Sequence, residues 1–280
     1  MNLETLFQRP KALPTIPYVM QELITSFNDE DVAVARLIAL ISADQVLSAN
    51  VLRMANSAYF EVPYTVSTVA DAVAKLGFTN VRTLVISIGL SGSFKAIPGI
   101  DARQFWRHSL HTAVVSRHLS AQVAVKPDLA FTVGLMHAIG ELVMHLGMPQ
   151  EMQQVDAALG LLDPNRLATE QATFGYTHAD VGAELARRWK FPNLFSKAIA
   201  GAANPLAQAD FDPLAAVVHI AAWRSRAEEN RVSTQDQEAD WSGTLAAKIP
   251  LSRNAVLQDL PSLETLSQGM ESLFSSENRL

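Results

Sequence analysis

The spacing of the apolar residues constrains the fold of this chain more than any other feature of its sequence. Apolar residues recur every three or four positions, which places them on one side of an α-helix. Clear examples are Ile16, Val19, Leu23, Ile24 and Phe27, and later Val81, Leu84, Val85 and Ile88. No segment shows the apolar–polar alternation between hairpin turns that is typical of strands. The sequence therefore predicts an all-α, multi-helix fold.

Local signals predict where several helices begin. Asp44 is a candidate N-cap for a helix over Gln45–Ala55. Thr177 and Asp180 have the spacing of a capping box, which opens a helix over 177–189. Further long helices are expected over 102–123, 129–146 and 213–227. The polar, acidic segment 228–240 is expected to be an exposed loop.

Pro98 and Gly99 separate a set of short helices from a set of longer ones. Proline and glycine together are typical of breaks between structural units. We therefore predict an N-terminal helical lobe over 1–98 and a second helical lobe over 99–280, which together form one module.

Composition excludes several classes of function. The 280 residues are 49% hydrophobic and 18% charged, which is typical of a globular protein. The net charge is −6 and no basic cluster is present, so nucleic acid is not an expected partner. The chain has no cysteine, which excludes disulfides, thiolate nucleophiles and cysteine-ligated metals. No Walker, dinucleotide-binding or nucleophile-elbow motif occurs.

No membrane span is expected. The most apolar stretch, 129–148, contains His137, Glu141 and His145, and a bilayer span rarely carries three such groups. A buried core helix explains this stretch better. The N-terminus shows no apolar segment followed by a cleavage site, so we expect a cytoplasmic protein.

The seven histidines all follow residue 105. His108 shares a largely apolar helix face with Thr112, and a buried, hydrogen-bonded histidine is the simpler explanation than a metal ligand. His178 lies in the first turn of its predicted helix, where it needs no function. His219 lies in an apolar run, where a satisfied core histidine is the default.

His137, Glu141 and His145 recur at four-residue intervals. An imidazole and a carboxylate one helical turn apart can both reach a divalent cation. A side-chain pair on a partly exposed helix face is the simpler alternative. The glutamate is not at the position that zinc proteases require, so the triplet alone carries little weight.

Several segments, taken in chain order, resemble the HDOD domain family. They extend over about residues 13–225 and are Leu13-Pro14-Thr15-Ile16-Pro17, Asp44, Leu52 to Phe60 (LRMANSAYF), Ala72 to Gly77 (AVAKLG), Val81-Arg82, Phe105 to Ser109 (FWRHS), Gly134 to Gly140 (GLMHAIG) and His178 to Leu185 (HADVGAEL). The resemblance implies a helical scaffold related to the HD phosphohydrolases. It also implies a role in bacterial signalling. HDOD proteins are regarded as signalling modules and generally lack demonstrated hydrolase activity.

The resemblance also implies which residues occupy the ancestral metal site. His108 matches the first histidine ligand and His137 matches the histidine of the His-Asp pair, whose aspartate is Ala138 here. His178 matches a histidine that two-metal relatives use. The late aspartate falls near Ala222, and the double histidine falls in 200–203, where no ligand is present. Glu141 stands where the family often has lysine, and we expect it to have a surface role rather than to replace the lost aspartate.

A hydrolytic metal needs several oxygen or imidazole donors and an open position for water. With Ala138 and Ala222 in place of carboxylates, we expect no catalysis, no metal and no other cofactor. The first hypothesis is therefore a non-catalytic signalling module that acts through protein partners. The alternatives are a residual metal-dependent phosphohydrolase, with His108, His137, His178 and Glu141 as ligands, or a sensor of a small nucleotide such as a cyclic dinucleotide. In the sensor, residues such as Arg53 and Arg107 would be the phosphate partners.

Overall fold

The computed structural model describes residues 2–9, 12–27, 34–57, 60, 65–94 and 97–270. Within these residues every regular element is a helix, so the all-α prediction is confirmed. Ala58 and Tyr59 of the N-terminal motif lie outside the described residues.

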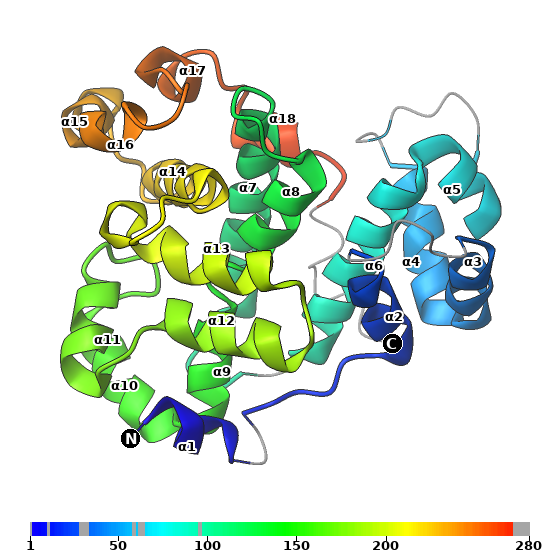
Figure 1. Cartoon of the computed structure of the whole chain (residues 1–280), viewed down its shortest axis with the longest axis horizontal. Helices are drawn as coiled ribbons and strands as arrows, with labels where there is room; N and C mark the ends of the chain where they lie inside the picture. The colour runs from blue at the N-terminus through cyan, green and yellow to red at the C-terminus, as the bar shows by residue number, and fades with distance from the viewer. Residues whose placement is uncertain are drawn as a thin grey trace.

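Five helices form the first lobe, and α1 lies apart from them (Figure 1). The five are α2 (Tyr18–Thr25), α3 (Val34–Ala43), α4 (Gln45–Ala55), α5 (Val69–Leu76) and α6 (Phe78–Ser93). Asp44 caps α4 as predicted, since its side chain accepts hydrogen bonds from the backbone N–H groups of Val46 and Leu47. Although α1 (Leu3–Phe7) begins the chain, it packs on α9 in the second lobe.

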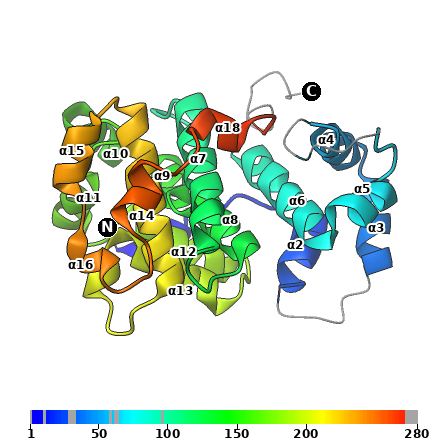
Figure 2. The same ribbon diagram turned by 90° about the horizontal axis from the view of Figure 1, so that it is seen from above.

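The second lobe contains the longer helices. They are α7 (Ala102–Ser120), α8 (Pro127–Met136), α9 (Ile139–Gly147), α10 (Pro149–Ala158), α11 (Arg166–Phe174), α12 (His178–Arg188), α13 (Asn193–Ala203), the 3₁₀ turn η2 (Pro205–Ala207) and α14 (Pro213–Glu229). Four short helices follow among the described residues: α15 (Thr234–Asp240), α16 (Gly243–Ala246), α17 (Arg253–Leu257) and α18 (Leu263–Ser267). Of these, α18 packs on α7 (Figure 2).

Two predictions of secondary structure were wrong. The segment 228–240, expected to be a loop, contains the end of α14 and all of α15, because Ser233 caps α15 by accepting from the backbone N–H of Asp236. The expected helix over 129–146 is interrupted at His137 and Ala138, which separate α8 from α9.

The helical run Pro127–Gly147 is long and apolar enough to cross a membrane, but 83% of its most apolar window is buried inside the protein. A bent pair, α3 and α4, meets the same criterion only if both helices are counted as one span. The core helix of a globular protein has the same composition, so this finding carries little weight.

Candidate functional site

Helices from distant parts of the sequence enclose one cavity of about 90 Å³ in the second lobe. All six residues that the sequence associates with the ancestral site line it: His108, His137, Ala138, Glu141, His178 and Ala222. They come from α7, the α8–α9 junction, α9, α12 and α14. The structure therefore brings the predicted site together in space.

The start of α9 lies very close to α12. A Cβ atom on Gly140 would stand only 1.9 Å from the carbonyl oxygen of His178 and 2.7 Å from the backbone nitrogen of Gly182. Glycine permits this approach, which places His137 and Glu141 beside His178.

His137 and His108 lie next to each other in the wall of the cavity. The Nδ1–H of His137 donates to the carbonyl of Gly134 at 2.7 Å, and the two imidazole rings lie 5.3 Å apart, edge to face. Burial lowers the pKa of His137 to about 4, and nearby cations contribute to this shift. Burial also lowers the pKa of His108. Both rings are therefore neutral at physiological pH.

His108 does not make the hydrogen bond expected of a satisfied core histidine. Within the described residues its buried Nδ1 has no hydrogen-bond partner, and a carboxylate oxygen of Glu229 is 4.0 Å away. His219 is satisfied as expected, since its Nδ1–H donates to the carbonyl of Ala202 at 2.7 Å.

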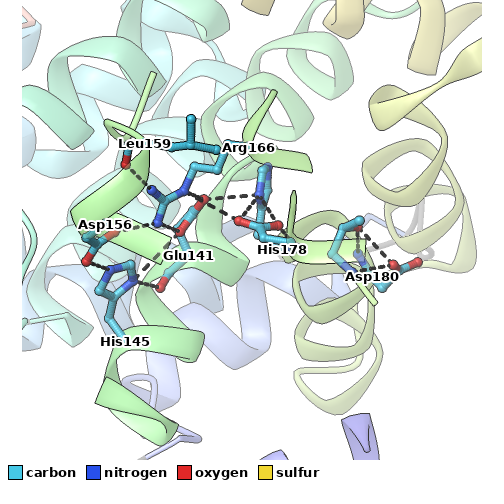
Figure 3. A network of polar contacts seen from close by, with 9 residues as sticks. Glu141, His145, Asp156, Leu159, Arg166, His178 and Asp180 are labelled. Carbon is cyan, nitrogen blue, oxygen red and sulfur yellow. Dashed lines mark hydrogen bonds and ion pairs between the residues drawn. The ribbon is translucent and has the colours of Figure 1, made fainter. Parts of the chain in front are cut away.

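His178 has the opposite charge state because two carboxylates flank its Nδ1 atom. Glu170 accepts from it at 2.8 Å. Glu141 lies 3.1 Å away from the same atom (Figure 3). Burial alone would lower the pKa of His178, but the two carboxylates outweigh burial and raise this pKa to about 10. Glu170 also accepts from the backbone N–H of His178 at 2.8 Å. This N–H belongs to the first turn of α12, and the positive end of a helix dipole favours a negatively charged group such as the Glu170 carboxylate.

Glu141 is buried, so the surface role expected for it was wrong. Only 1% of Glu141 is exposed, because α9 directs it toward Arg166 and His178 rather than toward solvent. Burial would raise the pKa of Glu141, but the positive charges of His178 and Arg166 hold it well below the ordinary value. The same helix buries His145, whose Nδ1–H donates to the carbonyl of Glu141 at 2.7 Å.

Arg166 is the central cation of this network. Its Nε lies 2.6 Å from Glu141 Oε1, and its Nη2 lies 3.0 Å from Glu141 Oε2. Nη2 also donates to Asp156 at 2.8 Å, and Nη1 donates to the carbonyl of Leu159 at 3.2 Å. Only 2% of Arg166 is exposed. Burial would lower the pKa of Arg166, but the surrounding carboxylates raise it above its ordinary value.

The donor set does not fit the metal centre of the active relatives. Within the described part of the chain, Glu141, Glu170 and His178 are the three metal-capable residues whose ligand atoms come within 4.8 Å of one another. Arg166 already contacts both of these glutamates, the second at 3.4 Å. His108, His137 and His178 do not form such a group, and Ala138 and Ala222 offer no donor.

The sequence did not reveal Arg166, Glu170 or Arg226 as parts of the site. Arg166 and Glu170 are four residues apart on α11, a spacing that can predict an ion pair. The spacing does not reveal that Arg166 also pairs with Glu141. Neither arginine suggested for phosphate binding lines the cavity. Arg53 lies on α4 in the first lobe and donates to Asn50, while Arg107 pairs with Glu229 at 2.9 Å.

Known proteins resemble this chain over most of its length. The family described as HDOD domain matches residues 13–205. The "Putative phosphohydrolase" of Shewanella amazonensis SB2B is 30% identical with a TM-score of 0.80, over 97% of this chain and 98% of that one. An HDOD domain protein of unknown function from Geobacter sulfurreducens is 23% identical with a TM-score of 0.70, over 98% and 92% of the two chains, and shows the fold alone.

A curated relative, an uncharacterized protein of Treponema pallidum (strain Nichols), is 26% identical over 215 residues, which are 75% of this chain. These residues span 41% of that relative, so the chain corresponds to about two-fifths of its length. Because the family match includes more than half of the residues and the motifs that surround the cavity, this chain belongs to the HDOD domain family.

Proposed function

We propose that this chain is a non-catalytic regulatory domain of a cytoplasmic signalling protein that acts through contacts with protein partners. The observation that carries the proposal is the position of Arg166. A guanidinium contacts the two glutamates where a divalent cation would need to bind, and its hydrogen bonds to Glu141, Asp156 and Leu159 hold it there. An incoming metal would have to displace a buried, multiply bonded cation, which is energetically unfavourable.

The missing carboxylates at Ala138 and Ala222 support the same proposal. Zinc hydrolases keep three protein ligands and an open position for water. Here one imidazole of the ancestral set, His178, is protonated between two glutamates, and a protonated imidazole cannot bind a metal through the nitrogen that carries the proton.

Contacts with other proteins find support on the first lobe. Tyr18 and Val46 are the most exposed of the large hydrophobic side chains in the described residues, at 55% and 60%. Val46 lines a shallow recess that also includes Ile16 and Ile88, at the junction of α2, α4 and α6. Exposed apolar groups beside a recess are typical of interaction surfaces.

The decisive experiment combines metal analysis with an assay of turnover. Protein purified without chelator or nickel is expected to contain far less than one metal ion per chain. With added manganese or iron, it is expected to release no phosphate from nucleotides or cyclic dinucleotides. Turnover that disappears in His137→Ala would show instead that the chain is a residual phosphohydrolase.

A gain of metal binding tests the role of Arg166 directly. Arg166→Met removes the competing cation and leaves Glu141, Glu170 and His178 as possible ligands. We expect this variant to bind about one zinc ion per chain, as three protein ligands suffice for zinc. The matched control is Arg166→Met combined with Glu170→Gln, which should not bind zinc. Equal metal content in the wild type and Arg166→Met would contradict the proposal.

A further inference from the structure

Arg226 lies in the wall of the same cavity but belongs to none of its ion pairs. It is on α14, one helical turn after Ala222, and it also borders a second recess of about 120 Å³ that Pro164, Trp223 and Asp240 line. The guanidinium therefore stands where the two recesses meet.

No hydrogen bond or ion pair within the described residues holds Arg226, in contrast to Arg166. Asp240 and Asp163 act on it only at longer range, and burial lowers its pKa more than they raise it. Its positive charge also contributes to the low pKa values of His108, His137 and His219, so it lies near all three imidazoles. None of its nitrogen atoms is among the described side-chain atoms that are fully buried without a partner, so the guanidinium is open to the recesses that it lines and can bind an anion there.

The charges that face Arg226 come from several helices. Glu141 on α9 is paired with Arg166 on α11 and with His178 on α12, so its oxygens are already occupied. Asp163 precedes α11, and its Oδ1 accepts from the backbone of Asn165. The carboxylates of Glu170 and Glu141 lie 2.8 and 3.1 Å from Nδ1 of His178, so this nitrogen is occupied and Nε2 is the ring nitrogen left for a ligand.

Two neutral imidazoles complete the wall as acceptors. His137 and His219 each donate from Nδ1 to a backbone carbonyl, and their Nε2 atoms therefore carry lone pairs. A ligand that suits this wall accepts hydrogen bonds from Arg226 and His178 and donates one to a neutral imidazole. Monohydrogen phosphate has both properties, whereas sulfate carries no proton at neutral pH.

The size of the cavity agrees with one tetrahedral anion. A volume of about 90 Å³ is several times the ~10–15 Å³ that a cavity needs to hold one water molecule, so a small tetrahedral anion fits. A further recess of about 240 Å³ lies beside His219, between Trp223 and Trp241, whose rings are 5.8 Å apart. An organic group attached to the phosphate would find room there.

We propose that this cavity binds a protonated phosphate group, without a metal, through Arg226 and His178. The phosphate is either inorganic phosphate or the end of a small phosphorylated ligand. This inference deepens the proposed regulatory function, because it gives the non-catalytic site an effector to bind.

Binding is tested by calorimetric titration of protein treated with EDTA, with inorganic phosphate as the probe and sulfate at equal ionic strength as the comparison. Wild type is expected to bind phosphate but not sulfate. Arg226→Met is expected to weaken phosphate binding about tenfold to a hundredfold, the usual loss for a hydrogen-bonded charged group. The matched control is Arg103→Met, which removes an exposed arginine of α7 outside the cavity and should leave binding unchanged.

Thermal unfolding without phosphate separates binding from folding. Arg226→Met should be at least as stable as wild type, because it removes an unpaired cation from a partly buried position. Arg226→Lys keeps the charge but not the bidentate geometry, and an intermediate affinity is expected. No phosphate binding by wild type, equal binding of sulfate, or equal affinity in Arg226→Met and Arg103→Met would overturn the inference.

The source of the phosphate is distinguished with a nucleoside monophosphate and the corresponding nucleoside. Tighter binding of the monophosphate than of inorganic phosphate supports a phosphorylated organic ligand, and weaker binding supports inorganic phosphate. Binding of the nucleoside as tight as that of its monophosphate would contradict a phosphate site. Metal-dependent phosphate release would overturn the proposed function while leaving this binding result intact, so the two failures are distinguishable.

Discussion

At the scale of single residues, the histidines of one cavity have opposite charge states. The Nδ1 atom of His137 meets the backbone carbonyl of Gly134. Burial lowers its pKa to about 4. His178 lies between Glu141 and Glu170, and these carboxylates raise its pKa to about 10. Neighbouring charges, rather than burial alone, decide which imidazole is protonated.

The raised pKa of His178 predicts how stability depends on pH. An unfolded histidine has a pKa of about 6.5, so the folded state holds the His178 proton more tightly. The stabilisation is fully present below about pH 6.5 and is lost as the pH rises toward 10. His178→Gln should therefore lower the free energy of unfolding most at pH 6 and least at pH 10.

The measurement is urea denaturation of wild type and His178→Gln at several pH values between 6 and 10. The difference between the two free energies of unfolding should shrink by up to about 1.4 kcal/mol per pH unit within this window. A difference that stays constant from pH 6 to pH 10 would show that His178 is not protonated between the two glutamates.

At the scale of the elements, local signals in the sequence predicted helix starts well. The capping box of α12 is present as predicted, with Thr177 accepting from Asp180 and Asp180 accepting from the backbone of Thr177. These contacts lie within four residues, so local sequence suffices to predict them.

Contacts between distant residues could not be predicted in the same way. The close approach of Gly140 to α12 joins residues that are about 40 positions apart in the chain. Glu141 was expected at the surface because its partner Arg166 is 25 residues away, on a helix that the sequence had not indicated. The convergence of the histidines was suggested by resemblance to a family, since periodicity places each histidine only on its own helix.

Gly140→Ala tests whether the contact between α9 and α12 holds the site together. The added Cβ would meet backbone atoms at 1.9 and 2.7 Å, and neither can move without separating the helices. We expect a loss of about 3 kcal/mol or more in the free energy of unfolding, at the upper end of the usual effect of overpacking. Phosphate binding should weaken as well, because His178 is displaced from Glu141.

The matched control is Gly92→Ala in the last turn of α6, where an added Cβ meets nothing within 4 Å. Alanine is the better helix former, so this variant should be neutral or more stable by up to about 1 kcal/mol. Both values come from denaturant unfolding monitored by circular dichroism. Similar stability of the two variants would mean that α9 and α12 separate without penalty.

At the scale of the whole molecule, the lobes meet over a continuous core, and a buried ion pair reinforces the contact. One apolar cluster extends from Leu6 to Met270 and includes residues of both lobes. Arg82 on α6 pairs with Asp128 on α8 at 2.8 Å, with side chains 10% and 16% exposed. The guanidinium carbon of Arg82 also lies 3.8 Å from the centre of the Phe27 ring. Arg82 therefore links α2, α6 and α8.

Arg82→Met is predicted to uncouple the lobes. It leaves Asp128 partly buried without its partner, a change that typically costs about 3–5 kcal/mol. All four tryptophans, Trp106, Trp189, Trp223 and Trp241, lie in the second lobe. Trp189 contacts Pro14 and Phe94 of the first lobe. In a Trp189→Phe background, tryptophan fluorescence therefore reports on the second lobe, and far-ultraviolet circular dichroism reports on the helices of both.

In this background, the two signals should change at the same urea concentration, as expected for a cooperative transition. In Arg82→Met, circular dichroism should begin to change at a lower urea concentration than fluorescence, because the first lobe loses its attachment and unfolds first. Combining Arg82→Met with Asp128→Asn should restore part of the lost stability, since no unpaired charge is left buried. Coincident transitions in Arg82→Met would mean that the apolar core alone couples the lobes, and the ion pair would then contribute only to their stability.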